Sequence, residues 1–292
     1  MQFNEQLIVL PAGEAPWLEF THHSSEPRAT RLHFATANGF TALSYSPFLS
    51  LLNEKYAVSS MDNRGAWTPC QHPPFAYGMR GFAKDWLAGM EQKIHQPVVG
   101  IGHSHGAQVT LHAALIAPQK FSKLILIEPA TIPFAALDYV YRFVPKLVMH
   151  ALLPFIRRTA SRQKTWTSRQ AFIERYKTHS TFRLFTHESF MAYVEHGLRE
   201  TEAGNFELIF DPAWESYIFR KIRFVWHYLR QTTHPTLLIR GAQSSLVSSK
   251  NFSKYNQNLP KNIEILELDD AHHMLPQEQP QRLQKFIEDW LD

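Results

Sequence analysis

Cysteine is almost absent from this chain, which has a single one, Cys70, in 292 residues. One cysteine cannot form an intramolecular disulfide, and it excludes a metal site built from several cysteines. A fold without disulfides is typical of a reducing compartment, so we expect a cytoplasmic protein.

Long apolar runs are also missing. No stretch reaches the roughly 18 apolar residues of a membrane-spanning helix, and the first residues lack the basic and apolar regions of a signal peptide. No H-E-x-x-H spacing occurs, and we expect neither a metal ion nor a cofactor. The formal net charge of +4 is modest, so nucleic acid is not an expected partner. The oligomeric state stays open.

One stretch combines an apolar strand, a sharp turn with a serine, and an alanine-rich helix. It runs from Pro97 through Gly102-His103-Ser104-His105-Gly106 to Leu115, so Ser104 lies in a G-x-S-x-G pattern. The two glycines let strand and helix approach closely and hold the serine exposed at a strained turn. The amino end of the following helix favours negative charge that develops there.

Apolar strands alternate with helices on both sides of this stretch, which indicates an α/β fold with a mostly parallel sheet covered on both faces. The alternation stops between about residues 132 and 232, where helical periodicity and aromatic residues prevail without a convincing buried strand. We therefore predict a core domain of residues 1–131 and 233–292, with an inserted helical cap of residues 132–232. Such an insertion lies over the carboxyl ends of the strands, where ligands bind in open α/β sheets.

Four blocks of the chain resemble the α/β-hydrolase superfamily, in particular its cap-bearing bacterial members close to esterases, epoxide hydrolases and haloalkane dehalogenases. The blocks are 37–40, 62–65, 102–106 and 273–276. The resemblance implies an eight-stranded, mostly parallel sheet with helices on both faces and an inserted cap. Epoxide hydrolases and dehalogenases use an aspartate as nucleophile, so Ser104 argues against both activities.

The resemblance implies roles for several residues. Ser104 is the expected nucleophile, and it needs a base. The family places its base histidine immediately before a Met-x-Pro sequence, which selects His273 over its neighbour His272. Family members commonly carry His-Gly at the start of the loop that binds the oxyanion, where this chain has Thr36-Ala37. The expected donors to the oxyanion are the backbone N–H groups of Asn38 and His105.

The third catalytic residue is missing from its usual place. The family commonly has an aspartate shortly after the seventh core strand, where this chain has Ser244 and Ser245. Glu128 ends the strand next to the one that leads into the Ser104 turn, which the superfamily calls the nucleophile elbow, and some dehalogenases and lipases of the superfamily place their acid there. We predict that a Glu128 carboxylate oxygen lies within about 3.2 Å of a ring nitrogen of His273. Asp269 and Asp270 are rivals, but they are too close in sequence to reach the buried side of His273.

The first half of the predicted cap is basic. Residues 142–183 hold ten Lys or Arg and one acid, Glu174, whereas the segment 195–215 is acidic and could pair with them. The apolar stretch 145–158 ends in two arginines, which fits a cap helix with a solvated rim or transient contact with an anionic membrane surface. No fixed charge is evident that would anchor an ionic substrate, and the many cap aromatics indicate an apolar pocket.

These residues together indicate a serine hydrolase that cleaves a small or medium hydrophobic carboxylic ester through an acyl-enzyme. The same three residues would also serve a C–C bond hydrolase, a thioesterase or a cofactor-free haloperoxidase. A hydrolase-fold binding protein without turnover is a further alternative, since the usual aspartate is absent.

Overall fold

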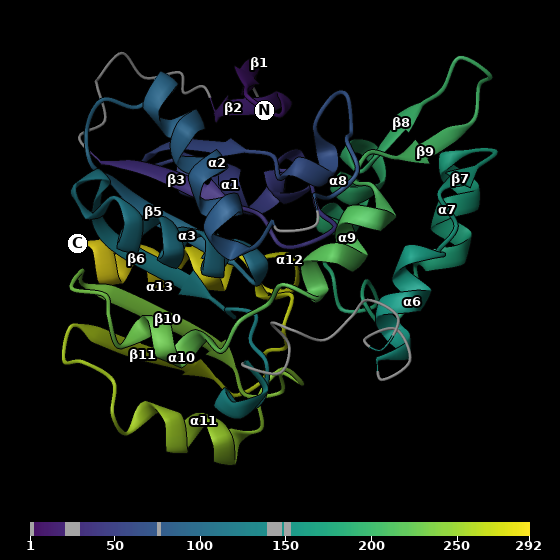
Figure 1. Ribbon diagram of the computed structural model, residues 1–292. Helices are drawn as coiled ribbons and strands as arrows, with labels where there is room; N and C mark the ends of the chain where they lie inside the picture. Colours follow the sequence, from purple (N-terminus) through teal and green to yellow (C-terminus); the bar gives the residue numbers. More distant parts are fainter. Residues whose placement is uncertain (1–2, 21–29, 75–76, 139–147, 149–152) are drawn as a thin grey trace.

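The computed structural model describes residues 3–20, 30–74, 77–138, 148 and 153–292, and its centre is an eight-stranded sheet (Figure 1). The strand order is β1-β2-β4-β3-β5-β6-β10-β11. Strands β1 and β2 pair antiparallel, as do β2 and β4, and every other pair is parallel. The strands are β1 (Phe3–Leu10), β2 (Gly13–Phe20), β3 (Arg31–Ala35), β4 (Ala57–Met61), β5 (Val98–His103), β6 (Phe121–Ile127), β10 (Thr236–Gly241) and β11 (Ile263–Leu268). The mostly parallel eight-stranded sheet implied by the resemblance is therefore confirmed.

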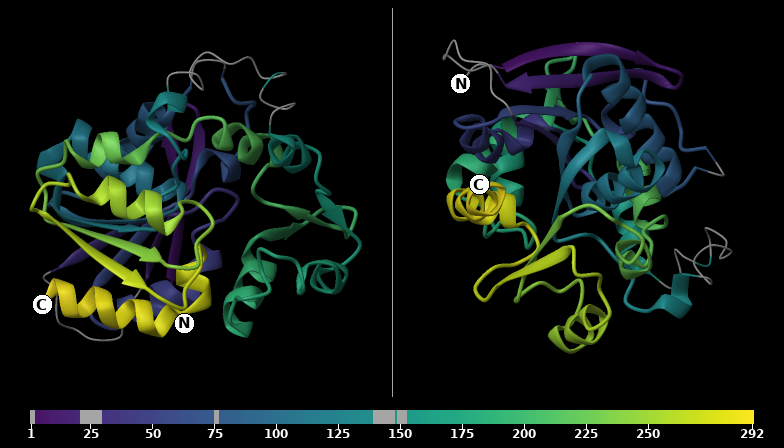
Figure 2. Two further views of the ribbon diagram at one scale, coloured as in Figure 1. Left: turned by 90° about the horizontal axis from the view of Figure 1, so that it is seen from below. Right: turned by 90° about the vertical axis from the view of Figure 1, so that its left-hand side faces the viewer.

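Helices cover both faces of the sheet (Figure 2). One face carries α2 (Met79–Lys93), α3 (His105–Ile116), α10 (Val225–Leu229) and α11 (Ser249–Asn256), and the other carries α1 (Ser46–Asn53), α12 (Leu275–Glu278) and α13 (Pro280–Leu291). Short 3-10 helices, η1 (Leu43–Tyr45), η2 (Arg64–Ala66) and η3 (Pro118–Lys120), occur in the connections.

Strand β6 shows why both faces must be covered. Its side chains alternate between the two faces, so Leu124 and Leu126 join one buried cluster while Ile125 and Ile127 join the other. All four are fully buried. A strand that is apolar at every position is stable only between two layers of helices.

The predicted cap follows β6 and contains more strand than the sequence indicated. Its elements are α6 (Pro154–Ala160), β7 (Thr165–Trp166), α7 (Arg169–Tyr176), α8 (His187–His196), β8 (Leu198–Glu200), β9 (Phe206–Leu208) and α9 (Pro212–Phe219). The three strands form an antiparallel sheet of order β7-β9-β8, so the insertion, predicted from its helical periodicity, also holds a small sheet. Strands of two or three residues are too short to show the alternation by which a strand is recognised.

The chain leaves and re-enters the core at neighbouring points. The Ile132 N–H donates to the Arg223 carbonyl at 3.4 Å, and the Gln108 side chain of α3 donates to the same carbonyl at 2.7 Å. Beyond this crossing, Trp226 and Leu229 of α10 share a buried cluster with Leu238 of β10. The division into core and cap at residues 131 and 233 stays a prediction.

None of the helices in the described residues has both the length and the apolar character needed to cross a membrane.

Candidate active site

Ser104 lies at the turn between β5 and α3 in a conformation that side chains rarely adopt, with φ of 55° and ψ of −115°. Its N–H donates to the Ile127 carbonyl and its carbonyl accepts from the Ala130 N–H, each at 3.0 Å. A Cβ added to Gly106 would lie 2.0 Å from the Ala35 carbonyl oxygen. The turn is therefore strained and tightly packed, as the sequence pattern predicted.

A continuous path of hydrogen bonds joins the three expected catalytic side chains. The His273 Nε2 lies 2.9 Å from the Ser104 Oγ, and the His273 Nδ1 lies 3.1 Å from the Glu128 Oε2. The second distance is within the predicted 3.2 Å. Because the carboxylate is an acceptor, Nδ1 carries the proton and donates, which leaves Nε2 free to accept from the serine hydroxyl.

Glu128 is held by several contacts at the end of β6. It is the second non-glycine residue with positive φ, 46°, among the described residues, and its side chain is buried. The Gly241 N–H donates to its Oε1 at 2.6 Å, and the Ser244 hydroxyl donates to its Oε2 at 2.6 Å. These two donors fix the carboxylate oxygens in place beside the histidine base.

The rival residues lie in other environments. His272 is 40% exposed, and its Nδ1 lies 3.5 Å from the Glu278 carboxylate. The Asp270 carboxylate pairs with Arg282, and Asp269 is exposed. The structure therefore brings His273, and not His272, to Ser104. It places Glu128, and neither Asp269 nor Asp270, against His273.

The loop after β3 packs on the amino end of α3, close to the serine. Thr36 contributes to this contact, because a Cβ on Gly106 would also lie 2.6 Å from its carbonyl oxygen. The Asn38 side chain donates to the Glu215 carbonyl at 2.9 Å, so it points toward the cap. Within the described part of the chain, the backbone N–H groups of Asn38 and His105 donate no hydrogen bond. Their role as oxyanion donors stays a prediction.

The His105 ring turns away from the serine. Its Nδ1 accepts from the Asn63 Nδ2 at 3.1 Å, and it meets the Phe82 ring edge to face at 4.8 Å. Burial lowers the pKa of His105 to about 3, so the ring is neutral. The expectation that His105 would act through its backbone is compatible with this placement.

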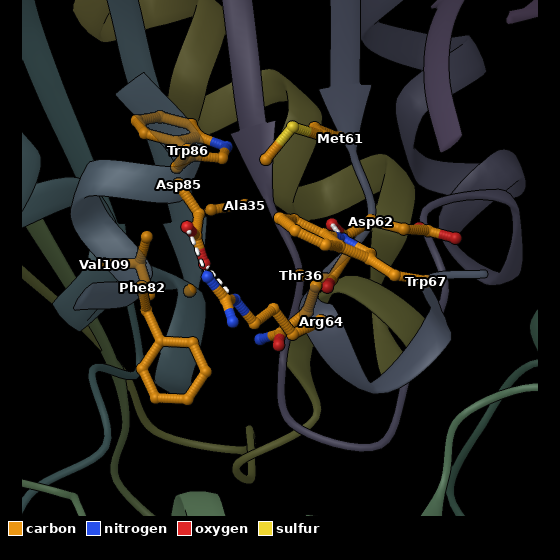
Figure 3. A pocket seen from close by; sticks show the side chains of 12 residues that line it. Ala35, Thr36, Met61, Asp62, Arg64, Trp67, Phe82, Asp85, Trp86 and Val109 are labelled. Atoms are coloured by element: carbon orange, nitrogen blue, oxygen red, sulfur yellow. Dashed lines mark hydrogen bonds and ion pairs between the residues drawn. The ribbon is translucent and has the colours of Figure 1, made fainter. Parts of the chain in front are cut away.

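A cavity lies between the ends of β3 and β4 and the helices α2 and α3 (Figure 3). The Arg64 guanidinium points across it to Asp85, with a 2.9 Å hydrogen bond, and stacks 4.3 Å from the Tyr77 ring. Asp62 accepts the Ala42 N–H at 2.5 Å, and burial raises the pKa of Asp62 to about 7. The residues lining the cavity do not include the serine, base or acid. These contacts agree with the interpretation that Asp62 and Arg64 fix the loop after β4.

Aromatic residues of the cap pack against the loop that follows Asn38. The Tyr193 ring of α8 lies 5.0 Å from the Phe40 ring, and Phe185 lies 6.3 Å from Phe40. The Tyr193 hydroxyl donates to the Gly39 carbonyl at 3.4 Å. The cap is thereby attached to the loop that carries the expected oxyanion donor.

A largely enclosed ion pair lies beside this loop, and each of its two charges is compensated by the other. The expectation that no fixed charge anchors an ionic substrate stays a prediction. The Arg162 Nη2 lies 2.7 Å from the Glu215 Oε2, and a Cβ on Gly39 would be 3.1 Å from the Glu215 Cδ. The buried Arg162 Nε has no hydrogen-bond acceptor among the described residues. With the pair between Lys164 and Asp211 at 3.4 Å, this contact confirms that the acidic segment pairs with the basic half.

Half of the apolar stretch proposed for membrane contact, 145–158, lies outside the described residues. Of its last part, Phe155, Arg157 and Arg158 are exposed on α6 while Ile156 is fully buried. The membrane contact therefore stays a proposal.

Among the described residues, no group of three or more His, Cys, Asp or Glu is placed to hold a metal ion.

Sequence reasoning missed three residues around the catalytic path. Ser244 was excluded as an acid, yet it supports the acid by a hydrogen bond. His103 was interpreted as a variable flanking residue, and Tyr45 carried no signal, although the two are joined by a 2.7 Å hydrogen bond. The position of His103 next to Ser104 is the one feature that could have drawn attention to it.

Comparison with known proteins agrees with this geometry. The family model described as "Alpha/beta hydrolase family" matches residues 32–285. The chain is 22% identical over 283 residues to the uncharacterized hydrolase YugF of Bacillus subtilis, covering 93% of each chain.

Solved structures share the fold at low sequence identity. E-2-(acetamidomethylene)succinate hydrolase matches with a TM-score of 0.77 and 19% identity over 100% of both chains. The thioesterase domain from the curacin biosynthetic pathway matches with a TM-score of 0.73 and 16% identity, over 99% of this chain and 100% of that domain. With the family model spanning most of its length, this chain belongs to the alpha/beta hydrolase family and is a hydrolase.

Proposed function

We propose that this hydrolase is a serine enzyme that cleaves a small or medium hydrophobic carboxylic ester through an acyl-enzyme. The observation that carries the proposal is the unbroken path from the Ser104 Oγ through His273 to the Glu128 carboxylate, at 2.9 and 3.1 Å. A serine hydroxyl is a poor nucleophile until a base accepts its proton, and this path supplies that base.

The reaction follows from the hydrogen bonds. The Ser104 Oγ attacks the ester carbonyl carbon while its proton passes to the His273 Nε2, and the Glu128 carboxylate stabilises the imidazolium that forms. The N–H groups of Asn38 and His105 would hold the oxyanion. The imidazolium then protonates the leaving alcohol. A water molecule, deprotonated by His273, attacks the acyl carbon and releases the acid and the serine.

The Tyr193 ring of the cap, which packs against Phe40 in the loop of Asn38, supports an apolar acyl group. The same residues would also serve a thioesterase, and one structural neighbour is a thioesterase domain. A C–C bond hydrolase or a cofactor-free haloperoxidase would use the same serine. A binding protein without turnover is disfavoured by the complete hydrogen-bonded path.

A second candidate substrate is an acyl compound that carries a carboxylate. The observation that favours it is the Arg162 Nε, which has no hydrogen-bond acceptor among the described residues, although Glu215 beside the Gly39 loop already pairs with the guanidinium at 2.7 Å. A structural neighbour bears the name of a hydrolase of a substituted succinate. A guanidinium N–H in a buried place binds a carboxylate strongly.

The testing experiment has two stages. A fluorophosphonate probe should label the wild-type protein at Ser104 and should not label Ser104→Ala, because the probe requires an activated serine. A panel of p-nitrophenyl esters and thioesters of increasing chain length, each with and without a terminal carboxylate, then identifies the substrate class. If the wild-type protein resists labelling, the proposal of a serine enzyme is wrong, and the binding protein takes its place.

The single cysteine supports our proposal of a cytoplasmic location. Transient contact of the basic cap with a membrane is tested by cosedimentation with anionic vesicles. Absence of salt-sensitive binding would dismiss that contact.

A further inference from the structure

A second series of hydrogen bonds connects two loops around the serine through η1 and β5, and it is separate from the path through Glu128. The Ala37 N–H donates to the Tyr45 Oη at 3.1 Å. The Tyr45 Oη lies 2.7 Å from the His103 Nδ1, and the His103 Nε2 lies 2.8 Å from the backbone carbonyl oxygen of His273. These hydrogen bonds thus run from the loop of Asn38, through β5, whose last residue is His103, to the loop of His273.

The direction of every bond in this chain is fixed. The His273 carbonyl can only accept, so the His103 Nε2 carries the proton and donates. Burial holds the pKa of His103 well below its usual value, so the ring is neutral and its Nδ1 accepts. The Tyr45 hydroxyl therefore donates to Nδ1 and accepts from Ala37. Burial also raises the pKa of Tyr45, which keeps its hydroxyl protonated.

The surroundings make this chain rigid. His103 is fully buried and Tyr45 is 1% exposed. The Tyr45 ring packs 4.8 Å from the Phe34 ring, and the His103 ring lies 5.2 Å from the His273 ring. Rings that are packed on all sides hold their hydrogen bonds in one geometry, because no other rotamer has room.

We propose that His103 and Tyr45 are positioning residues for the reaction, with His103 fixing the backbone of the base and Tyr45 coupling it to the oxyanion loop. This inference rests on the proposed function of Ser104 and His273. The base reaches the serine only while its backbone stays in place, and a displacement of about 1 Å costs on the order of 100-fold in rate. The Tyr45 contact to Ala37 fixes the peptide next to Asn38, the expected oxyanion donor.

Two substitutions of His103 form a matched pair. An asparagine side chain reaches the place of Nδ1, whereas a glutamine side chain reaches the place of Nε2. His103→Gln therefore keeps a donor for the His273 carbonyl, and His103→Asn removes it. We expect His103→Asn to lower kcat about 10- to 100-fold and His103→Gln to lower it about threefold or less, with KM nearly unchanged in both.

Active sites are counted by fluorophosphonate labelling, and kcat is expressed per labelled site. A purely structural role would reduce the labelled fraction or the melting temperature and leave kcat per site unchanged. If both variants have the same kcat per site, the proposed role of the Nε2 donor is overturned.

Tyr45→Phe is the second test, since it removes one oxygen and keeps the packed ring. We expect kcat per site to fall about three- to tenfold, because the loop of Ala37 and the His103 ring both lose a partner. An unchanged kcat overturns the coupling through Tyr45, whether or not the His103 variants fold.

The hydrogen-bond chain is also tested without activity, by nitrogen-15 NMR of the wild-type protein, with His103 assigned from its contact to the Tyr45 ring. We expect a neutral ring with its proton on Nε2 from pH 5.5 to 8. A proton on Nδ1, or a ring that titrates in this range, would overturn the inference. A protein that fails the labelling test but passes this one would refute the serine enzyme and keep the hydrogen-bond chain.

Discussion

The Ser244 hydroxyl donates to the Glu128 Oε2 at 2.6 Å, and the same oxygen accepts from the His273 Nδ1 at 3.1 Å. Ser244 follows β10, the seventh strand of the main sheet in chain order, where the family commonly has its aspartate. The serine thus occupies the neighbourhood of the usual acid and supports a carboxylate that comes from another strand. The two positions lie close together because β6 and β10 are neighbours in the sheet.

His273→Ala should abolish ester turnover almost as completely as Ser104→Ala, because the serine loses the group that accepts its proton. His272→Ala is the matched control. It should keep activity within a few-fold, since its ring faces Glu278 and is 40% exposed. Steady-state kinetics of the two variants decide the matter. A greater loss in His272→Ala would show that the wrong histidine has been assigned as base.

Glu128→Gln should lower kcat by about 10⁴-fold, as the matching change does in a serine protease, because an amide cannot stabilise the imidazolium and favours the wrong tautomer. Ser244→Ala should have a much smaller effect, since it removes one of two donors and leaves the carboxylate. Circular dichroism controls for folding. Near-normal kcat in Glu128→Gln would remove this residue from the mechanism.

Much of this site was predictable because its residues lie in local patterns. The G-x-S-x-G turn identifies Ser104, and the position immediately before Met-x-Pro identifies His273. Glu128 was identified because the apolar run before it predicts a buried strand, and that strand was expected beside the one that leads to Ser104. Tyr45 could not be found, because its contact with His103 spans 58 positions and has no local pattern. The small cap sheet escaped because its strands have only two or three residues, too few to show an alternating pattern.

Stability should fall when the solution is acidified from pH 7 to pH 5. Burial lowers the pKa of His33 to about 3 and that of His112 to about 4, so these rings bind protons at pH 5 only after unfolding. His103 and His105 shift in the same direction. Asp62, with a pKa raised to about 7, has the opposite effect, because the folded protein binds its proton first. Burial also raises the pKa of Asp85 and of Glu215 and lowers that of His196. Because five histidines with lowered pKa values outnumber three carboxyls with raised ones, we expect the unfolded state to bind more protons and to be favoured by acid.

Chemical denaturation at pH 5.5, 6.5 and 7.5 measures this dependence. The control is His112→Gln, which removes one titrating group at the partly exposed end of α3. Below pH 6.5, the free energy of unfolding of the wild-type protein should fall more steeply with falling pH than that of this variant. We expect the two slopes to differ by about 1.4 kcal/mol per pH unit. Parallel curves for the two proteins would contradict a neutral buried His112.

The last prediction concerns the place of the acid. Glu128→Ala should lose about 10⁴-fold in kcat and leave space beside Ser244. Adding Ser244→Asp to that variant places a carboxylate within reach of the vacated position, because the serine oxygen already lies 2.6 Å from the Glu128 Oε2. We expect the double variant to regain at least about tenfold in kcat, since a carboxylate on Nδ1 restores the tautomer of the base.

Ser244→Asp alone is the informative control. Two buried carboxylates side by side repel each other, which raises the pKa of one of them and destabilises the folded protein near neutral pH. We therefore expect a lower melting temperature for this variant at pH 7.5, and a smaller deficit at pH 5. If the double variant recovers no activity while remaining folded, the end of β10 cannot deliver an acid to His273. The geometry would then require the carboxylate to come from β6.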